Sequence, residues 1–279
     1  MLRTSVVLAA LVAVAVGTFE MPELLMTEET LQALYPLDSA AVAAGRCQND
    51  LQLTLCQAQF DEDLGFNANL QWRNSTTLTR LIKKLLIQVD FQKVIDVCSA
   101  RQKFYSCMGA FYPSCVNRYS LLSKDGASWS NVMPYVKLWE HLDFLCNAGF
   151  DVIQPQWLCN ARVESANATA IEACQATFQK HLNSANWKHI CDRNLVPEYA
   201  QCVQKIASAG CSPSLGWFAC EDVRVGYARD CPEIRCSVSS EEALDECRRA
   251  FDDGIEQNPN SYSLASTMAS CNQGIFGPS

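Results

Sequence analysis

The sequence predicts an all-α fold made of disulfide-stapled helical repeat units, two full and one partial. Three observations lead to this prediction. Apolar residues recur at three- and four-residue intervals, as in amphipathic helices, while the alternating pattern of strands is scarce. The motif aliphatic-x-x-Cys-x-x-x-Phe occurs three times. The chain of 279 residues also contains 16 cysteines, an even number that allows up to eight disulfides.

The first seventeen residues have the pattern of a secretory signal peptide. Arg3 supplies a positive charge, residues 5–16 (SVVLAALVAVAV) are apolar, and Ala15 and Gly17 put small residues at a cleavage site. The apolar run covers about twelve residues, whereas a membrane-spanning helix needs about twenty. We therefore expect a signal peptide over residues 1–17, a secreted, extracellular chain and no membrane insertion.

The charge of the mature chain argues against nucleic acid as a partner. Without Arg3 the chain keeps 21 basic residues against 30 acidic ones, and the basic residues form no stripe. Proteins that bind nucleic acid or anionic membranes usually carry such a basic patch. We expect neither partner.

All sixteen cysteines follow the signal segment, and in an oxidising compartment such residues form disulfides. The predicted disulfide cysteines are Cys47, Cys56, Cys98, Cys107, Cys115, Cys146, Cys159, Cys174, Cys191, Cys202, Cys211, Cys220, Cys231, Cys236, Cys247 and Cys271. Two Asn-x-Ser/Thr sequons, at Asn74 and Asn167, fit the same compartment and predict glycosylation.

Residues 18–46 contain no cysteine and are rich in acidic side chains. We expect a lightly ordered arm there, with one short helix near Thr27 to Tyr35. A propeptide remains an alternative for this segment, although no dibasic site marks its end.

The clearest helical pattern lies after the first cysteines. Leu78, Leu81, Ile82, Leu85 and Val89 form the apolar stripe of an amphipathic helix about twenty residues long. This stripe has the spacing that a helix face requires.

Two further helices follow from the same reasoning. The leucines of residues 138–145 lie at helical spacing, and Gly149 is a candidate stop just after them. Near the C-terminus, Ser239 and Glu242 resemble a capping box that opens a helix running through Phe251.

The repeated motif predicts a buried helix face in each unit. Offsets of −3 and +4 from the cysteine place the aliphatic residue and the phenylalanine on the same side of a helix. The three copies are Leu53, Cys56 and Phe60; Ile171, Cys174 and Phe178; and Leu244, Cys247 and Phe251. We interpret each cysteine as a core-facing staple, because no reactive-thiol environment accompanies it.

The order of cysteines divides the chain into a first unit, 47–158, and a second unit with a truncated third, 159–279. Two cysteines nine residues apart on one helix lie about 13.5 Å apart, too far for a disulfide. Cys47 therefore cannot pair with Cys56 on one helix, nor Cys98 with Cys107. The first unit has six cysteines and can close on itself, whereas the second and third have seven and three and must share a bridge.

Several segments resemble secreted cysteine-rich repeat proteins of nematodes. They are CQNDLQLTLCQAQF, CNARVESANATAIEACQATF and CDRNLVPEYAQCVQKIASAGC. One similar group is a nematode extracellular domain of unknown function, which FLCNAGFDVIQPQWLC resembles most; the other is the globular module of type-4 chondroitin proteoglycans. The resemblance covers residues 47–250 and implies no catalytic residue. No glycine here follows a serine, so we do not expect attached chondroitin chains.

Motifs for catalysis or metal binding are absent from the sequence. The three histidines, His141, His181 and His189, are not adjacent to any cysteine, and no Cys-x-x-Cys pair occurs. A nucleophilic thiol usually needs such a base, and zinc sites favour such pairs. We predict no catalytic residue, no cofactor and no metal, and expect the chain not to be an enzyme.

Two functions remain open. The first is a secreted, non-catalytic module that binds an extracellular protein or matrix component. The alternative is a carrier of a hydrophobic small molecule or lipid, which predicts a closed apolar cavity of several hundred Å³.

Overall fold

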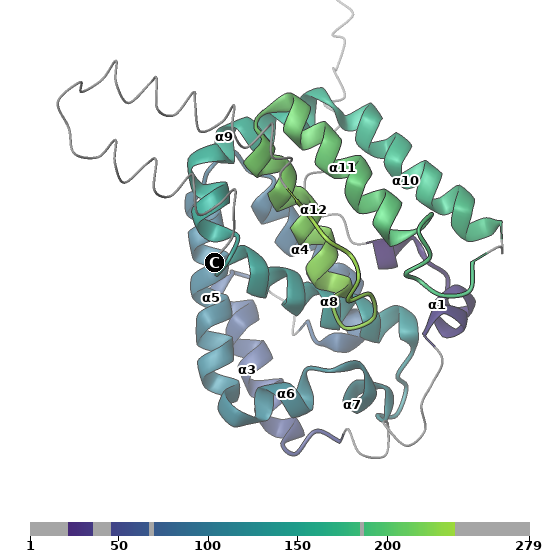
Figure 1. Ribbon diagram of the computed structural model, residues 1–279. Helices are drawn as coiled ribbons and strands as arrows, with labels where there is room; N and C mark the ends of the chain where they lie inside the picture. Colours follow the sequence, from purple (N-terminus) through teal and green to yellow (C-terminus); the bar gives the residue numbers. More distant parts are fainter. Residues whose placement is uncertain (1–21, 36–45, 67–69, 185–186, 238–279) are drawn as a thin grey trace, which may run out of the picture.

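The computed structural model describes residues 22–35, 46–66, 70–184 and 187–237, which are helical and contain no strand (Figure 1). The all-helical prediction is confirmed for these residues. The helices are η1 (Pro22–Leu25), α1 (Glu28–Leu34), α3 (Asp50–Asp63), η2 (Trp72–Asn74), α4 (Ser75–Leu86), α5 (Gln92–Met108), η3 (Gly109–Phe111), α6 (Tyr112–Cys115), α7 (Arg118–Leu122), α8 (Trp129–Leu145), α9 (Phe150–Ala166), α10 (Ala168–Asn183), α11 (Val196–Gly210) and α12 (Pro213–Tyr227).

Helix α8 lies between the two halves of the molecule, with α3 and α5 on one side and α10, α11 and α12 on the other (Figure 1). Its side chains enter both hydrophobic clusters: Leu138 and Trp139 belong to one, and Trp129 and Met133 belong to the other. Almost every side of this helix is therefore buried, which is why its sequence lacks a long polar face.

The first copy of the repeated motif forms a buried face of α3, as predicted. Leu53, Cys56 and Phe60 are each at most 4% exposed. Phe60 packs against Trp139 of α8 at 4.9 Å and Phe104 of α5 at 6.1 Å between ring centroids.

The second copy does the same on α10. Ile171, Cys174 and Phe178 are buried, and Phe178 lies 5.7 Å from the ring of Tyr199 on α11. The third copy and the predicted helix from Ser239 lie outside the described residues.

The predicted helix of about twenty residues is shorter than expected. Helix α4 has twelve residues and ends at Leu86, and Val89 is 63% exposed. The reason lies in Asp90, whose side chain accepts a hydrogen bond from the N–H of Gln92. That carboxylate satisfies a free N–H at the start of α5, so residues 87–91 form a turn between the two helices.

The N-terminal arm is packed more firmly than the sequence suggested. The short helix is confirmed as α1, with Thr27 accepting a hydrogen bond from the N–H of Thr30. Leu31 and Leu34 are buried in the cluster that contains Trp129. The arm therefore contributes to the core of the described structure.

Glu28 fixes the arm to the beginning of α8. Its carboxylate accepts hydrogen bonds from the N–H groups of Trp129 and Ser130, at 2.9 and 2.7 Å, and so caps a helix about a hundred residues away. Partial burial raises the pKa of Glu28, but these hydrogen bonds outweigh it and lower the pKa overall. This cap is therefore lost only at acidic pH.

Seven disulfides link the helices of the described residues. They are Cys47–Cys115, Cys56–Cys107, Cys98–Cys146, Cys159–Cys211, Cys174–Cys202, Cys191–Cys231 and Cys220–Cys236. As expected from the geometry, neither Cys47 with Cys56 nor Cys98 with Cys107 forms a bridge. The six cysteines between Cys47 and Cys146 close among themselves, whereas Cys247 and Cys271 lie outside the described residues.

The two halves of the chain share one continuous helix and part of one core. The predicted boundary between residues 158 and 159 falls inside α9. Val163, Leu215 and Phe218 belong to the same cluster as the core of the first unit. Gly149, the expected helix stop, precedes α9, and a Cβ there would lie 2.7 Å from the ring of Phe218.

Among the described residues, no helix combines the length and the apolar character that crossing a bilayer needs.

Candidate functional site

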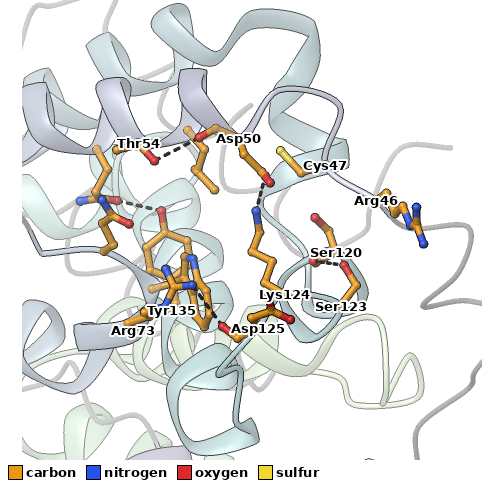
Figure 2. A pocket seen from close by; sticks show the side chains of 14 residues that line it. Arg46, Cys47, Asp50, Thr54, Arg73, Ser120, Ser123, Lys124, Asp125 and Tyr135 are labelled. Carbon is orange, nitrogen blue, oxygen red and sulfur yellow. Dashed lines mark hydrogen bonds and ion pairs between the residues drawn. The ribbon is translucent and has the colours of Figure 1, made fainter.

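A polar pocket of about 480 Å³ lies beside α3 and is the candidate binding site (Figure 2). Its walls come from α3, from the segment that leads into α4, from α7 with the turn after it, and from α8. Its volume is within the usual range for small-ligand sites.

The local sequence places polar side chains of α3 toward this pocket. Asn49 caps the helix by accepting a hydrogen bond from the N–H of Gln52. Asp50 and Thr54, one turn apart, then face the pocket. The Cys47–Cys115 bridge holds the entry to this helix against the end of α6.

The floor of the pocket is a chain of hydrogen bonds that runs into the core. The hydroxyl of Tyr135 donates to Gln57 Oε1 at 2.7 Å, and Gln57 Nε2 donates to Asp61 Oδ1 at 3.0 Å. The other oxygen of Asp61 accepts from the N–H of Leu70 at 2.5 Å. Burial raises the pKa of Asp61 to about 6, although the hydrogen bonds from Gln57 and Leu70 lower it in part.

Three cationic residues line the pocket, namely Arg46, Arg73 and Lys124. Lys124 forms an ion pair with Asp50, and Figure 2 shows Lys124 pointing toward Asp50, with Tyr135 on one side and Ser120 on the other. Arg73 stacks over the ring of Trp72 at 4.2 Å.

The charged groups differ in how far they are exposed. The side chain of Lys124 is 15% exposed, whereas that of its partner Asp50 is 64% exposed. Arg73 donates one hydrogen bond to the backbone oxygen of Asp125 at 3.1 Å. Lys124 is thus largely enclosed by the protein, whereas Arg73 and the acidic partner of Lys124 are exposed.

Ser120 supplies a buried hydroxyl at the pocket wall. The residue is fully buried, and among the described residues its Oγ has no hydrogen-bond partner. Ser123 donates to the backbone oxygen of Ser120 at 2.7 Å, which leaves the Ser120 hydroxyl out of that contact. A buried hydroxyl without a partner costs free energy.

Replacing Asp61 with asparagine is expected to remove a pH-dependent loss of stability. The pKa of Asp61 rises from 3.8 to about 6 on folding, so between these values the folded protein binds more protons than the unfolded chain. Stability therefore falls as the pH rises through this window, by on the order of 2 kcal/mol, and levels off above it. An asparagine at this position can accept a hydrogen bond from the N–H of Leu70. Its amide NH2 can donate to Gln57 Oε1 once the side-chain amide of Gln57 rotates. Urea unfolding from about pH 4 to pH 7 should show a flatter profile for Asp61→Asn than for the wild type.

The neighbouring exposed residue provides the control for that experiment. Glu62→Gln removes a carboxylate from the same turn of α3 but from its solvent side. Its profile should follow the wild type. A slope that is the same in Asp61→Asn and in the wild type would contradict the assignment to Asp61.

The structure brings few of the sequence-predicted residues into this pocket. Of the cysteines, only Cys47 is among its lining residues. The sequon residue Asn74 is exposed next to it at the start of α4, whereas Asn167 is half-buried and donates to the backbone oxygen of Val163 at 2.9 Å. The residues that form the pocket, such as Tyr135 and Lys124, carry no signal in the sequence because each is an isolated polar residue.

Two other groups of chemically active side chains lie outside this pocket, and their partners are other side chains of the protein. His141 Nδ1 lies 3.0 Å from Asp222 Oδ1, and both residues are buried between α8 and α12. Cys191, Cys231 and Glu233 lie close together, but the two sulfurs are bonded to each other. Because metal-binding cysteines act as thiolates, this group does not fit a metal ion.

Comparisons with known proteins do not place the chain in a family. No protein-family model matches it, no curated protein matches it, and no solved structure matches it.

Proposed function

We propose that the chain is a secreted, non-catalytic helical module that binds an extracellular protein or matrix component. The observation that carries this proposal is that seven disulfides hold the helices together, and that one of them, Cys47–Cys115, lies at the edge of an open, polar pocket. Disulfides persist in oxidising compartments, and a surface held by them loses little freedom on binding.

The positions of individual bridges support a pre-formed site. Cys47–Cys115 and Cys56–Cys107 both tie α3 to the segment that contains α5 and α6. The pocket side of α3, with Asp50 and Thr54, is thereby fixed relative to the residues that follow α6. A rigid site of this kind suits a binding module that works outside the cell.

The order of the bridges supports a division into repeat units. In the first unit the first cysteine pairs with the fifth, the second with the fourth and the third with the sixth. The cysteines from Cys159 to Cys231 pair in the same order once Cys220 is set aside. Cys220 pairs with Cys236, which fits a partial third unit that shares a bridge with the second. We infer two units and part of a third from this shared order.

The pockets give less support to a carrier of lipids. The apolar hollow among α9, α10, α11 and α12 has a volume of about 30 Å³, which is room for about one water molecule. The larger hollow between α10 and α11, about 780 Å³, has Arg193, Glu198 and Lys205 among its lining residues. Neither is the closed apolar cavity that a lipid carrier needs.

The proposal can be tested by capture of partners from extracellular fluid of the source organism. The oxidised protein, made through a secretory pathway, is immobilised beside the double variant Arg73→Gln/Lys124→Met and beside a reduced and alkylated sample. A partner that saturates the oxidised protein and is lost from the reduced sample supports a disulfide-held binding module; loss from the double variant as well assigns it to the pocket.

Two results would overturn the proposal. One is capture that is equal for oxidised and reduced protein, which would show binding that does not depend on the folded surface. The other is a lipid that stays bound in native mass spectrometry of the purified chain, which would favour the carrier.

A further inference from the structure

We propose that the polar pocket beside α3 binds an acidic saccharide, and that Lys124 and Arg73 receive the carboxylate or sulfate group of one sugar residue. This inference rests on the proposed function and names the chemical class of the matrix component.

Lys124 is the first group that points to an anion. Its ammonium group faces Asp50, and that carboxylate is mostly in solvent. An ion pair with one exposed partner contributes little to stability. A ligand carboxylate or sulfate can therefore take the place of Asp50 on Lys124 at low cost, because Asp50 can turn outward into water.

Arg73 is the second group, and it is held in position before any ligand arrives. The stacking on Trp72 and the hydrogen bond to the backbone oxygen of Asp125 orient the exposed guanidinium group. A guanidinium group has five N–H donors, so most of them remain for a ligand. A fixed guanidinium group suits the two oxygens of a carboxylate or sulfate.

The remaining walls fit hydroxyl groups. Thr54 and Ser123 contribute accessible hydroxyl groups to the lining, and Gln71 contributes a half-buried amide. Leu53 and Trp72 are apolar and both at most 4% exposed. A peptide partner would need accessible apolar pockets for its side chains, so the lining favours a polyhydroxylated ligand over an acidic peptide.

The net charge of the protein limits how acidic the ligand can be. The chain carries a formal net charge of −8, so a long polyanion would be repelled by the rest of the surface. The pocket therefore recognises one acidic sugar residue, at a chain end or within a sparsely charged saccharide. Its affinity should fall only modestly with salt, because few charges are involved.

Isothermal titration calorimetry with matched disaccharides tests this inference. The probes are a disaccharide that ends in glucuronic acid, the same disaccharide that ends in glucose, and a sulfated form of the neutral one. We expect saturable binding of the glucuronate or sulfate probe, and binding of the glucose probe that is weaker by about tenfold or more. The comparison of glucuronate with sulfate shows which anion the pocket prefers.

Variants locate the binding in the pocket. Lys124→Met and Arg73→Gln should each weaken binding of the acidic probe by about tenfold, the size expected for a lost charge-assisted contact. Lys103→Met is the matched control. Lys103 of α5 is an exposed lysine that pairs with Asp63 of α3, and both residues lie outside the pocket. If Lys124→Met does not fold, two measurements still test the saccharide site. They are the affinity of Arg73→Gln and the comparison of acidic with neutral probe on the wild type.

The outcomes separate this inference from the proposed function. Equal binding of acidic and neutral probes, no saturable binding of any probe, or binding of tetraglutamate as strong as that of glucuronate would overturn the saccharide site. The proposed function would survive each of these results if the oxidised protein still captures a partner that the reduced protein does not.

Discussion

Replacing Trp139 with alanine is expected to lower the free energy of unfolding by about 3 to 5 kcal/mol. Trp139 is 1% exposed and joins three helices. Its ring stacks on Phe104 of α5 at 3.9 Å and lies 4.9 Å from Phe60 of α3. The truncation would leave a large cavity between α3, α5 and α8, since the disulfides around it prevent the helices from closing the gap.

Urea unfolding of oxidised protein measures this effect, with two variants for comparison. Trp139→Phe keeps part of the aromatic contact and should lose less than Trp139→Ala. Leu158→Ala removes an apolar side chain that is 55% exposed on α9, and its change should stay within about 0.5 kcal/mol. A loss for Trp139→Ala as small as that for Leu158→Ala would contradict the packing described for this core.

Replacing Lys137 with alanine is expected to cost a similar amount, about 3 to 5 kcal/mol. The side chain of Lys137 is 3% exposed, and Nζ lies 3.5 Å from Glu140 Oε2 and 3.5 Å from Asp230 Oδ2. It also donates to the backbone oxygen of Gly226. Its removal takes away the buried cation between Glu140 and Asp230, which keep only their ion pairs with Arg229 and Arg118.

The network around Lys137 joins distant parts of the chain. Asp230 also pairs with Arg118 of α7 at 2.5 Å, and Lys137 lies 4.8 Å from the ring centroid of Tyr227. The backbone oxygen of Asp230 lies 2.9 Å from the sulfur of Cys191. Lys137 and Arg118 thus share Asp230 and link α7, α8 and the segment that follows α12.

A surface ion pair provides the control for Lys137. Lys103 pairs with Asp63 at 3.2 Å, but its side chain is 59% exposed, so Lys103→Ala should cost less than about 1 kcal/mol. Lys137→Met keeps the aliphatic stem and loses the charge. Lys137→Met would unfold at the same urea concentration as the wild type only if the charge does not stabilise the fold. In that case the loss of unfolding free energy in Lys137→Ala comes from packing, and the role assigned to the charge is wrong.

Much of the fold could be predicted because it depends on local periodicity. The motif Leu53, Cys56 and Phe60 specifies one face of a helix, and the structure buries that face. The same reasoning failed at Val89, where the cap formed by Asp90 ends the pattern early. It also missed the anchoring of Glu28 to α8, since the two groups lie a hundred residues apart in the sequence.

The disulfide pairing and the pocket could not be predicted from the sequence. Parity limits which units share a bridge, but six cysteines still allow fifteen pairings, and only the packing of the helices selects one. The pocket joins Arg73, Lys124 and Tyr135, which are ordinary polar residues on three separate elements. Their proximity depends on how η2, the turn after α7 and α8 pack, so no spacing along the chain could have indicated it.

The central claim is a module whose first unit closes its own bridges and whose remaining cysteines form a second closed set. Mass spectrometry of peptides from the non-reduced protein tests it most directly. We expect the seven bridges of the structure, and parity predicts one further pair between Cys247 and Cys271. A peptide that joins a cysteine of residues 47–146 to one of residues 159–271, or a cysteine bonded to a second chain, would contradict the account.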